Sequence, residues 1–302
     1  MAAKIHVITH EACLEHSGGP GHPERPDRLR TLNALFAEKA EDLEMHEAPE
    51  ATREQIERLH PASYVDHVQE TCRSGGGALD PDTSVIPESW AAGLRAAGGG
   101  IRAVHLAAET GRNVFAAVRP PGHHAVASQA MGFCLFGNIA IAAEEARAAG
   151  LAEQVLIIDW DVHHGNGTQA LVENEPAIRF ISMHQWPLYP HTGREDERGV
   201  GNVWNVPRPP GRPPEEYVAA LNEAIDQATD GWEPGMVLIS AGYDAMRGDP
   251  LAGFTLDAEH YGEIVRHIRQ RVPGAPIVAM LEGGYDLENL RAGVEVTLRE
   301  LA

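Results

Sequence analysis

Short apolar runs recur along the chain, separated by longer stretches in which apolar residues are spaced three or four apart. Each run has four or five residues and is rich in β-branched side chains, a pattern typical of strands that are covered on both faces of a parallel sheet. The predicted strands are Ile5–Ile8, Val114–Val118, Val155–Ile158, Ile178–Ile181, Met236–Ile239 and Ile277–Leu281.

The stretches between the runs predict amphipathic helices. Alternating strands and helices indicate an α/β fold with a single, mostly parallel central sheet and helices on both faces. Three glycine- or proline-rich segments are expected to be turns or loops, and none is long enough to separate two domains. We therefore predict one domain over residues 1–302. The apolar faces of the predicted helices are Leu29, Leu32, Leu35 and Phe36; Tyr217, Leu221 and Ile225; and Tyr261, Ile264, Val265 and Ile268. The glycine- or proline-rich segments expected to be turns or loops are Ser74–Gly77, Gly98–Gly100 and Pro207–Pro214.

Four of the predicted strands run directly into histidine, aspartate or tyrosine residues. In an open parallel sheet, ligands bind outside the carboxyl ends of the strands. The sequence therefore predicts that one edge of the sheet carries a catalytic or binding site. The four segments are Arg119–His124, Asp159–His164, Ala241–Asp244 and Glu282–Tyr285.

Asp161 and His163 lie two residues apart at a strand end, so their side chains are expected to point the same way. Asp244 would add a third ligand from a distant strand, which gives the three-ligand arrangement of catalytic zinc. Its two carboxylates leave iron, cobalt and manganese open as alternatives. A simpler explanation of a lone Asp-x-His pair is a helix cap beside a core histidine, but it would have to account separately for Asp244 and for the tandem His123-His124.

The tandem histidines suit proton transfer. A metal that polarises a carbonyl and a water still needs a side chain that takes the water's proton and returns it to the leaving group. Because like charges push pKa values apart, His123 and His124 need different partners, and Asp159 is a candidate partner for one of them. Tyr285, after two glycines, could donate a hydrogen bond to a developing oxyanion. Taken alone, each of these residues could equally be an ordinary loop or core residue.

Charge and composition limit the classes of binding partner that we expect. The 302 residues include 44 acidic and 24 basic residues, a formal net charge of −20. Such an excess repels phosphate backbones, so direct nucleic-acid binding is not expected, whereas cationic partners are favoured. No secretory signal or membrane-spanning run is evident, which favours a cytoplasmic protein without membrane partners. The three cysteines (Cys13, Cys72 and Cys134) have no disulfide or zinc-knuckle spacing.

The motifs at the strand ends resemble the zinc-dependent histone deacetylase family, closest to its class II branch and bacterial relatives. The resemblance implies the arginase/deacetylase fold and an enzyme that hydrolyses an acyl-amide. It extends from about residue 16 to 290, and residues 22–29 (HPERPDRL) fit it as well. The matching segments are RPPGHHA (119–125), MGFCLFGN (131–138), DWDVHHGNGTQ (159–169), SAGYD (240–244), GDPL (248–251) and LEGGY (281–285).

The resemblance also implies roles for individual residues. Zinc would be bound by Asp161, His163 and Asp244, and His124 would be the general base and acid. His123 would give electrostatic help with Asp159, Tyr285 would polarise the acyl carbonyl, and Asn166 stands where class I members carry aspartate. A structural potassium ion would use Asp159, Asp161, His163, Ser182 and Met183, partly through backbone carbonyls. Substrate contacts would come from Gly132, Phe133, Tyr189, Leu251 and Gly283, with Phe133 and Tyr189 as the two aromatic walls of a tunnel.

The substrate is left open between two enzymatic alternatives. Leu251 stands where polyamine-specific relatives carry glutamate, which favours acyl-lysine in a peptide or protein, whereas the net charge of −20 would also attract acetylpolyamines or other acylated amines. A third alternative, a non-enzymatic acyl-lysine reader, is disfavoured because it would not need the full set of metal ligands, tandem histidines and tyrosine. A manganese ureohydrolase is disfavoured because it would need a second set of bridging Asp and His ligands, which the sequence does not show. Association with further copies of the chain is also left open.

Overall fold

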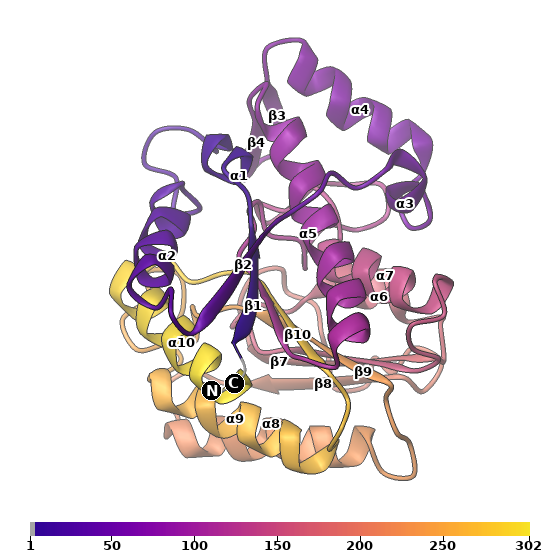
Figure 1. The fold of residues 1–302 in the computed structure, drawn as a ribbon, viewed down its shortest axis with the longest axis vertical. Helices are drawn as coiled ribbons and strands as arrows, with labels where there is room; N and C mark the ends of the chain where they lie inside the picture. The colour runs from indigo at the N-terminus through magenta and orange to yellow at the C-terminus, as the bar shows by residue number, and fades with distance from the viewer. Residues whose placement is uncertain (1–3) are drawn as a thin grey trace.

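The computed structural model describes residues 4–302, so the first three residues of the predicted 1–302 domain lie outside the described residues. An eight-stranded sheet runs through the middle of the protein (Figure 1), with strand order β2-β1-β5-β10-β9-β6-β7-β8. Every neighbouring pair in it is parallel. The α/β prediction of one mostly parallel sheet is therefore confirmed.

All six predicted strands are present. The strands at the centre of the sheet are buried along their whole length, because helices cover them on both sides. Val114–Val118 forms a shorter strand than predicted, since only its first three residues pair with the neighbouring strands. The observed strands are β1 (Ile5–Thr9), β5 (Val114–Ala116), β6 (Val155–Asp159), β7 (Ile178–Gln185), β9 (Met236–Ala241) and β10 (Ile277–Leu281).

The structure also contains strands that the apolar pattern did not reveal. β2 (Leu43–Glu47) and β8 (Val203–Arg208) form the two edges of the sheet. Edge strands carry polar residues and tolerate proline, so they lack the continuous apolar run of a central strand. A separate antiparallel pair joins β3 (Gly77–Asp80) and β4 (Thr83–Val85).

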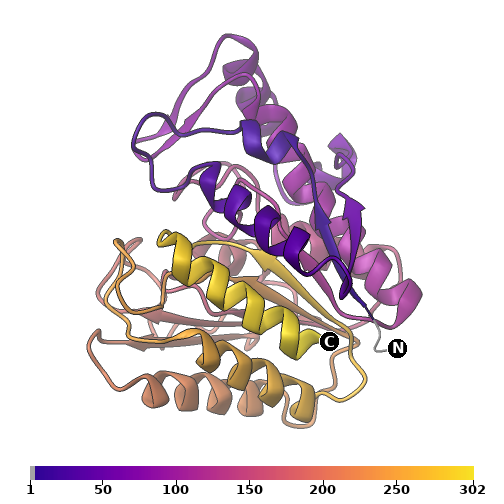
Figure 2. The same cartoon turned by 60° about the vertical axis from the view of Figure 1, so that its left-hand side comes forward.

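Helices cover both faces of the sheet (Figures 1 and 2). One face carries a row of helices that pack successively, α2, α10, α9 and α8, and the other carries α5, α6 and α7. The helices are α1 (Ala12–Glu15), α2 (Asp27–Glu38), α3 (Arg53–Glu57), α4 (Ala62–Arg73), α5 (Ser89–Thr110), α6 (Asn138–Ala148), α7 (Asn166–Val172), α8 (Pro214–Ala228), α9 (Ala258–Arg271) and α10 (Leu287–Leu301).

The prediction of a turn at Gly98–Gly100 is wrong, because these glycines lie inside α5. The reason is close packing: a Cβ on Gly98 would lie 2.0 Å from the carbonyl oxygen of Pro49, and one on Gly100 would lie 2.6 Å from the Met280 side chain. The predicted loop Pro207–Pro214 is also shorter than expected, since its first two residues belong to β8 and its last begins α8.

Candidate active site

The site lies at the carboxyl ends of the central strands. The segments that follow β5, β6, β9 and β10 bring His123, Asp161, Asp244 and their neighbours together, as expected from the parallel order of these strands. Hydrogen bonds between the segments fix their relative positions. The backbone NH of Val162 donates to Asp244 Oδ1 at 2.9 Å, and that of Gly283 donates to Asp161 Oδ2 at 2.8 Å.

Asp161, His163 and Asp244 form a compact set of potential metal ligands. One ligand atom from each lies within 4.8 Å of the others, and all three residues are buried. His163 Nδ1 is 3.1 Å from Asp161 Oδ1 and 3.1 Å from Asp244 Oδ2. Two carboxylates and one imidazole are ligands that zinc and other divalent transition metals accept. The donor set therefore fits a divalent metal ion.

The electrostatics of this set favour a cation. Burial opposes a charge on His163, but the carboxylates of Asp161 and Asp244 outweigh it and raise the pKa of His163 to about 10. Burial and the charge of Asp161 also raise the pKa of Asp244 to about 7. Buried carboxylates this close together need a compensating positive charge, which a bound metal ion would supply.

Two glycines allow the carboxylates to come this close. A Cβ on Gly242 would lie 2.0 Å from Asp161 Oδ2, and one on Gly283 would lie 2.1 Å from Asp244 Oδ2. Any side chain at either position would therefore displace a carboxylate. The glycines next to the ligands are explained by this approach of backbone to carboxylate.

The tandem histidines have different partners, as the sequence led us to expect. His123 Nδ1 lies 3.0 Å from Asp159 Oδ2, and His124 Nδ1 lies 2.7 Å from Asn166 Oδ1. Burial opposes a charge on His123, but Asp161 and Asp159 hold the pKa of His123 well above its usual value. Burial and the positive charges of His123 and His163 hold the pKa of His124 well below its usual value. The arrangement separates a cationic imidazole from a neutral one.

Two aromatic side chains pack against His124 and Tyr285. The Tyr189 ring lies edge-on to His124 at 5.2 Å between centroids, and Phe133 lies edge-on to Tyr285 at 6.0 Å. Gly132 carries no side chain because a Cβ there would meet the His124 ring at 2.3 Å. The structure thus brings three of the predicted substrate residues, Gly132, Phe133 and Tyr189, next to the predicted catalytic residues.

Glu282 supports the histidine loop, a role that the sequence did not reveal. Its Oε2 accepts hydrogen bonds from the backbone NH groups of Gly122 and His123, at 2.7 and 3.2 Å. Burial raises the pKa of Glu282 to about 7, against the opposing effect of His123. The only sequence feature that pointed to Glu282 was its position next to Gly283, inside the strand-end segment.

Two further residues that the sequence did not reveal, Arg28 and Asp249, hold the backbone that carries Tyr285. Arg28 is buried, pairs with Glu24, and donates from Nε to the carbonyl oxygen of Gly284 at 2.7 Å. Asp249 Oδ2 accepts from the backbone NH of Tyr285 at 2.8 Å, and its Oδ1 accepts from that of Leu251 at 3.0 Å. These contacts hold the backbone that carries Tyr285 and link it to the half-buried Leu251.

The residues predicted to hold potassium lie on adjacent strands. Ser182 is paired in register with Asp159 between β6 and β7, and Met183 follows it on β7. Asp159 is occupied on both oxygens, because Oδ1 accepts from the backbone NH of Asp161 at 3.1 Å while Oδ2 faces His123. The Asp159 side chain therefore supports the backbone of Asp161 and the imidazole of His123.

Two simpler predictions can also be compared with the structure. Cys13, Cys72 and Cys134 are free thiols, as their spacing led us to expect, and all three are buried. Among residues 4–302, no helix is both long enough and apolar enough to cross a membrane.

The histone deacetylase domain family matches residues 22–301. The chain is 38% identical to the histone deacetylase-like amidohydrolase of Pseudomonas aeruginosa, over 79% of this chain and 65% of that protein. It is 39% identical to a probable deacetylase of Methanothermobacter thermautotrophicus, over 78% of this chain and 72% of that one. The crystal structure of the HDA15 HD domain superposes with a TM-score of 0.94 at 35% identity, covering 99% of this chain and 88% of the other. The parallel sheet thus has the arginase/deacetylase arrangement, and the chain belongs to the histone deacetylase family.

Proposed function

We propose that the protein is a zinc-dependent amidohydrolase that removes the acyl group from acyl-lysine. The observation that carries the proposal is the buried set of Asp161, His163 and Asp244 next to the differently partnered His123 and His124. A zinc ion held by that set would supply a Lewis acid for the acyl carbonyl and for water. We also propose that residues 1–302 act as one catalytic domain, because the site combines segments from four central strands.

His124 is the general base in this proposal. A hydrogen on Nδ1 would be donated to Asn166 Oδ1, which leaves Nε2 free to accept a proton from the attacking water. The lowered pKa of His124, caused by burial and by the charges of His123 and His163, keeps this imidazole neutral and ready to accept that proton. The same nitrogen would then return the proton to the leaving amine.

His123 and Tyr285 stabilise negative charge on the acyl oxygen. His123 stays cationic beside Asp159 and Asp161 despite its burial, so its positive charge stabilises the negative charge that develops on the acyl oxygen during attack. Burial and the nearby Asp244 hold the pKa of Tyr285 well above its usual value, although Arg28 partly opposes this, so the phenol remains a hydrogen-bond donor.

We also propose a structural potassium ion near Asp159, Ser182 and Met183.

The Asn166→Asp variant should shift the pH dependence of catalysis. A carboxylate in contact with His124 favours the imidazolium form and should raise the pKa of His124 by about 1 to 3 units. Because the base must be neutral, the acidic limb of the kcat/KM profile should move to higher pH by the same amount. The profile is measured with an acetyl-lysine peptide. Asn166→Ala removes the hydrogen bond without adding charge, so it should lower the rate without this upward shift; an unmoved limb in Asn166→Asp would contradict the assignment of His124.

The substrate class is tested by comparing kcat/KM for acetyl-lysine peptides, longer acyl-lysines and acetylspermidine. We expect the acetyl-lysine peptide to be preferred, because Leu251 offers no charge to a distal ammonium group. Leu251→Glu should shift the ratio toward acetylspermidine by about two- to fivefold, the usual strength of a partly exposed ion pair. Leu251→Gln is the matched uncharged control. Failure of the zinc-loaded protein to hydrolyse any acyl-lysine would overturn the proposal.

The alternative function is deacylation of an acetylpolyamine or another small acylated amine. The net charge of −20 favours it, because an acidic surface attracts polycations. A native preference for acetylspermidine in the same comparison would support this alternative. Most of these charges are equally explained by solubility, which is why acyl-lysine is preferred here.

A further inference from the structure

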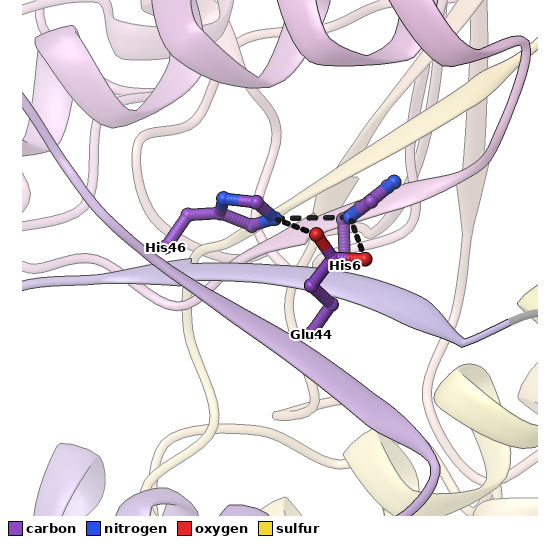
Figure 3. Close-up of side chains that lie close together, drawn as sticks. All are labelled: His6, Glu44 and His46. Atoms are coloured by element: carbon purple, nitrogen blue, oxygen red, sulfur yellow. Dashed lines mark hydrogen bonds and ion pairs between the residues drawn. The ribbon is translucent and has the colours of Figure 1, made fainter.

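A second group of metal-ligating side chains lies far from the catalytic strand ends, on the outer pair of strands β1 and β2. Figure 3 shows His6, Glu44 and His46 with their polar ends turned toward one another. One ligand atom from each lies within 4.8 Å of the others. β2 is the edge strand of the sheet, so this group ties the edge to its neighbour.

Strand register explains how the group forms. His6 pairs with Glu44 in the parallel β1–β2 ladder, and Ile8 pairs with His46. Residues two apart on a strand share a face, so Glu44 and His46 point to the same side as His6. The geometry follows from the sheet itself and does not depend on a flexible loop.

The distances suit a small divalent ion. His6 Nδ1 lies 2.9 Å from His46 Nε2 and 3.5 Å from Glu44 Oε2, and His46 Nε2 lies 3.8 Å from Glu44 Oε1. Tetrahedral zinc with bonds of about 2.0–2.2 Å places its ligand atoms about 3.3–3.6 Å apart. The observed separations lie on both sides of that range, so shifts of a few tenths of an ångström would complete three of four positions.

His6 presents its Nδ1 to the other two side chains from a buried position. Its side chain is almost fully buried, while those of His46 and Glu44 are 22% and 49% exposed, so an ion could enter from solvent. Within residues 4–302, the buried Nε2 of His6 has no hydrogen-bond partner. A metal would bind at Nδ1, the nitrogen that faces His46 and Glu44, and Nε2 would keep its proton without a partner, so the ligand role rests on the convergence of the three side chains.

Arg112 is the main opposing charge. Its Nη1 lies 3.6 Å from Glu44 Oε2, so it competes with a cation for one carboxylate oxygen. Glu44 Oε1 faces His46 and remains available to a metal. An ion would therefore bind with the carboxylate shared between metal and guanidinium.

We propose that His6, Glu44 and His46 form a second zinc site that fastens the edge strand β2 to β1. Two imidazole nitrogens and one carboxylate oxygen are a recognised zinc-binding set, with water in the fourth position. Edge strands open more easily than central ones, so a cross-strand metal link would act where the sheet is weakest.

The first test is zinc content per chain, measured by mass spectrometry after equilibration with buffered free zinc and removal of unbound ions. The native protein should bind one more zinc ion than His46→Ala, whichever metal occupies the catalytic set. Asp161→Ala should retain the outer zinc ion, which separates this proposal from that of catalytic zinc. His267→Ala is the matched control, because His267 is 26% exposed and lies 3.0 Å from Asp226 but belongs to neither group of possible metal ligands found among residues 4–302. Equal zinc content in native protein and His46→Ala would overturn the proposal.

Hydrogen exchange provides a second measurement. Adding zinc to Asp161→Ala should slow exchange of the β2 backbone amides, because the ion holds the edge strand closed. The same addition to a chain carrying both Asp161→Ala and His46→Ala should leave these rates unchanged. Protection of β2 in the double variant, or none in the single one, would contradict a metal link between the strands.

Discussion

The Asp161→Ala variant is expected to lose the catalytic zinc ion and the deacetylase activity together. Asp161 is fully buried, its Oδ1 lies 3.1 Å from His163 Nδ1, and its Oδ2 accepts a hydrogen bond from Gly283. Removing a supporting partner of a metal ligand already costs about 10–100-fold in affinity or activity, so removing a ligand should cost more than 10²-fold. Zinc per chain should fall by one relative to the native protein, measured alongside turnover of an acetyl-lysine peptide.

A loss of folding would produce the same loss of activity, so a second variant is needed. Asp161→Asn keeps the size of the side chain and an acceptor oxygen but removes the negative charge that attracts the ion. We expect it to retain the native circular dichroism spectrum and still lose zinc and activity. Turnover that persists in metal-free protein would refute the zinc mechanism.

The central strands were predictable from the sequence because helices cover both their faces, which requires continuous apolar runs such as Val155–Ile158. The edge strand β2, with the sequence LEMHE, lacked that signal because much of it faces solvent. Gly98–Gly100 was misleading for a different reason. Glycine marks a turn when its backbone freedom is used, but here its small size is used, and that depends on Pro49 and Met280, which are distant in sequence.

The residues of the site also divide into those with a local sequence signal and those that depend on distant parts of the chain. Asp161, His163 and Asp244 lie within a few residues of the ends of apolar runs, so the rule that the carboxyl ends of parallel strands share one edge predicted that they would meet. Glu282 and Arg28 act by holding backbone groups of distant loops, and no local pattern reveals such contacts. His6 and His46 are 40 residues apart without a shared motif, so only the register of β1 and β2 brings them together.

Tyr285→Phe is expected to lower kcat by about 10²–10³, with little change in KM. The variant keeps the ring, which packs edge-on to Phe133 and lies under the Arg28 guanidinium, so substrate binding should be preserved. What it loses is the hydroxyl, whose pKa is held well above its usual value by burial and by Asp244. Loss of one donor to a developing oxyanion typically has this effect on kcat. Steady-state kinetics on an acetyl-lysine peptide give both constants.

Tyr189→Phe is the matched control, because Tyr189 also lies next to the histidines but is assigned only a wall of the substrate site. Removing its hydroxyl should change kcat by no more than a few-fold, since no step requires that group to donate to the acyl oxygen. A large kcat loss confined to Tyr285→Phe would identify the donor, because each variant removes one phenol oxygen and keeps the aromatic ring. If kcat of Tyr285→Phe stays within a few-fold of the native value, another group must stabilise the oxyanion, and His123, cationic beside Asp159, would be the remaining candidate on this chain.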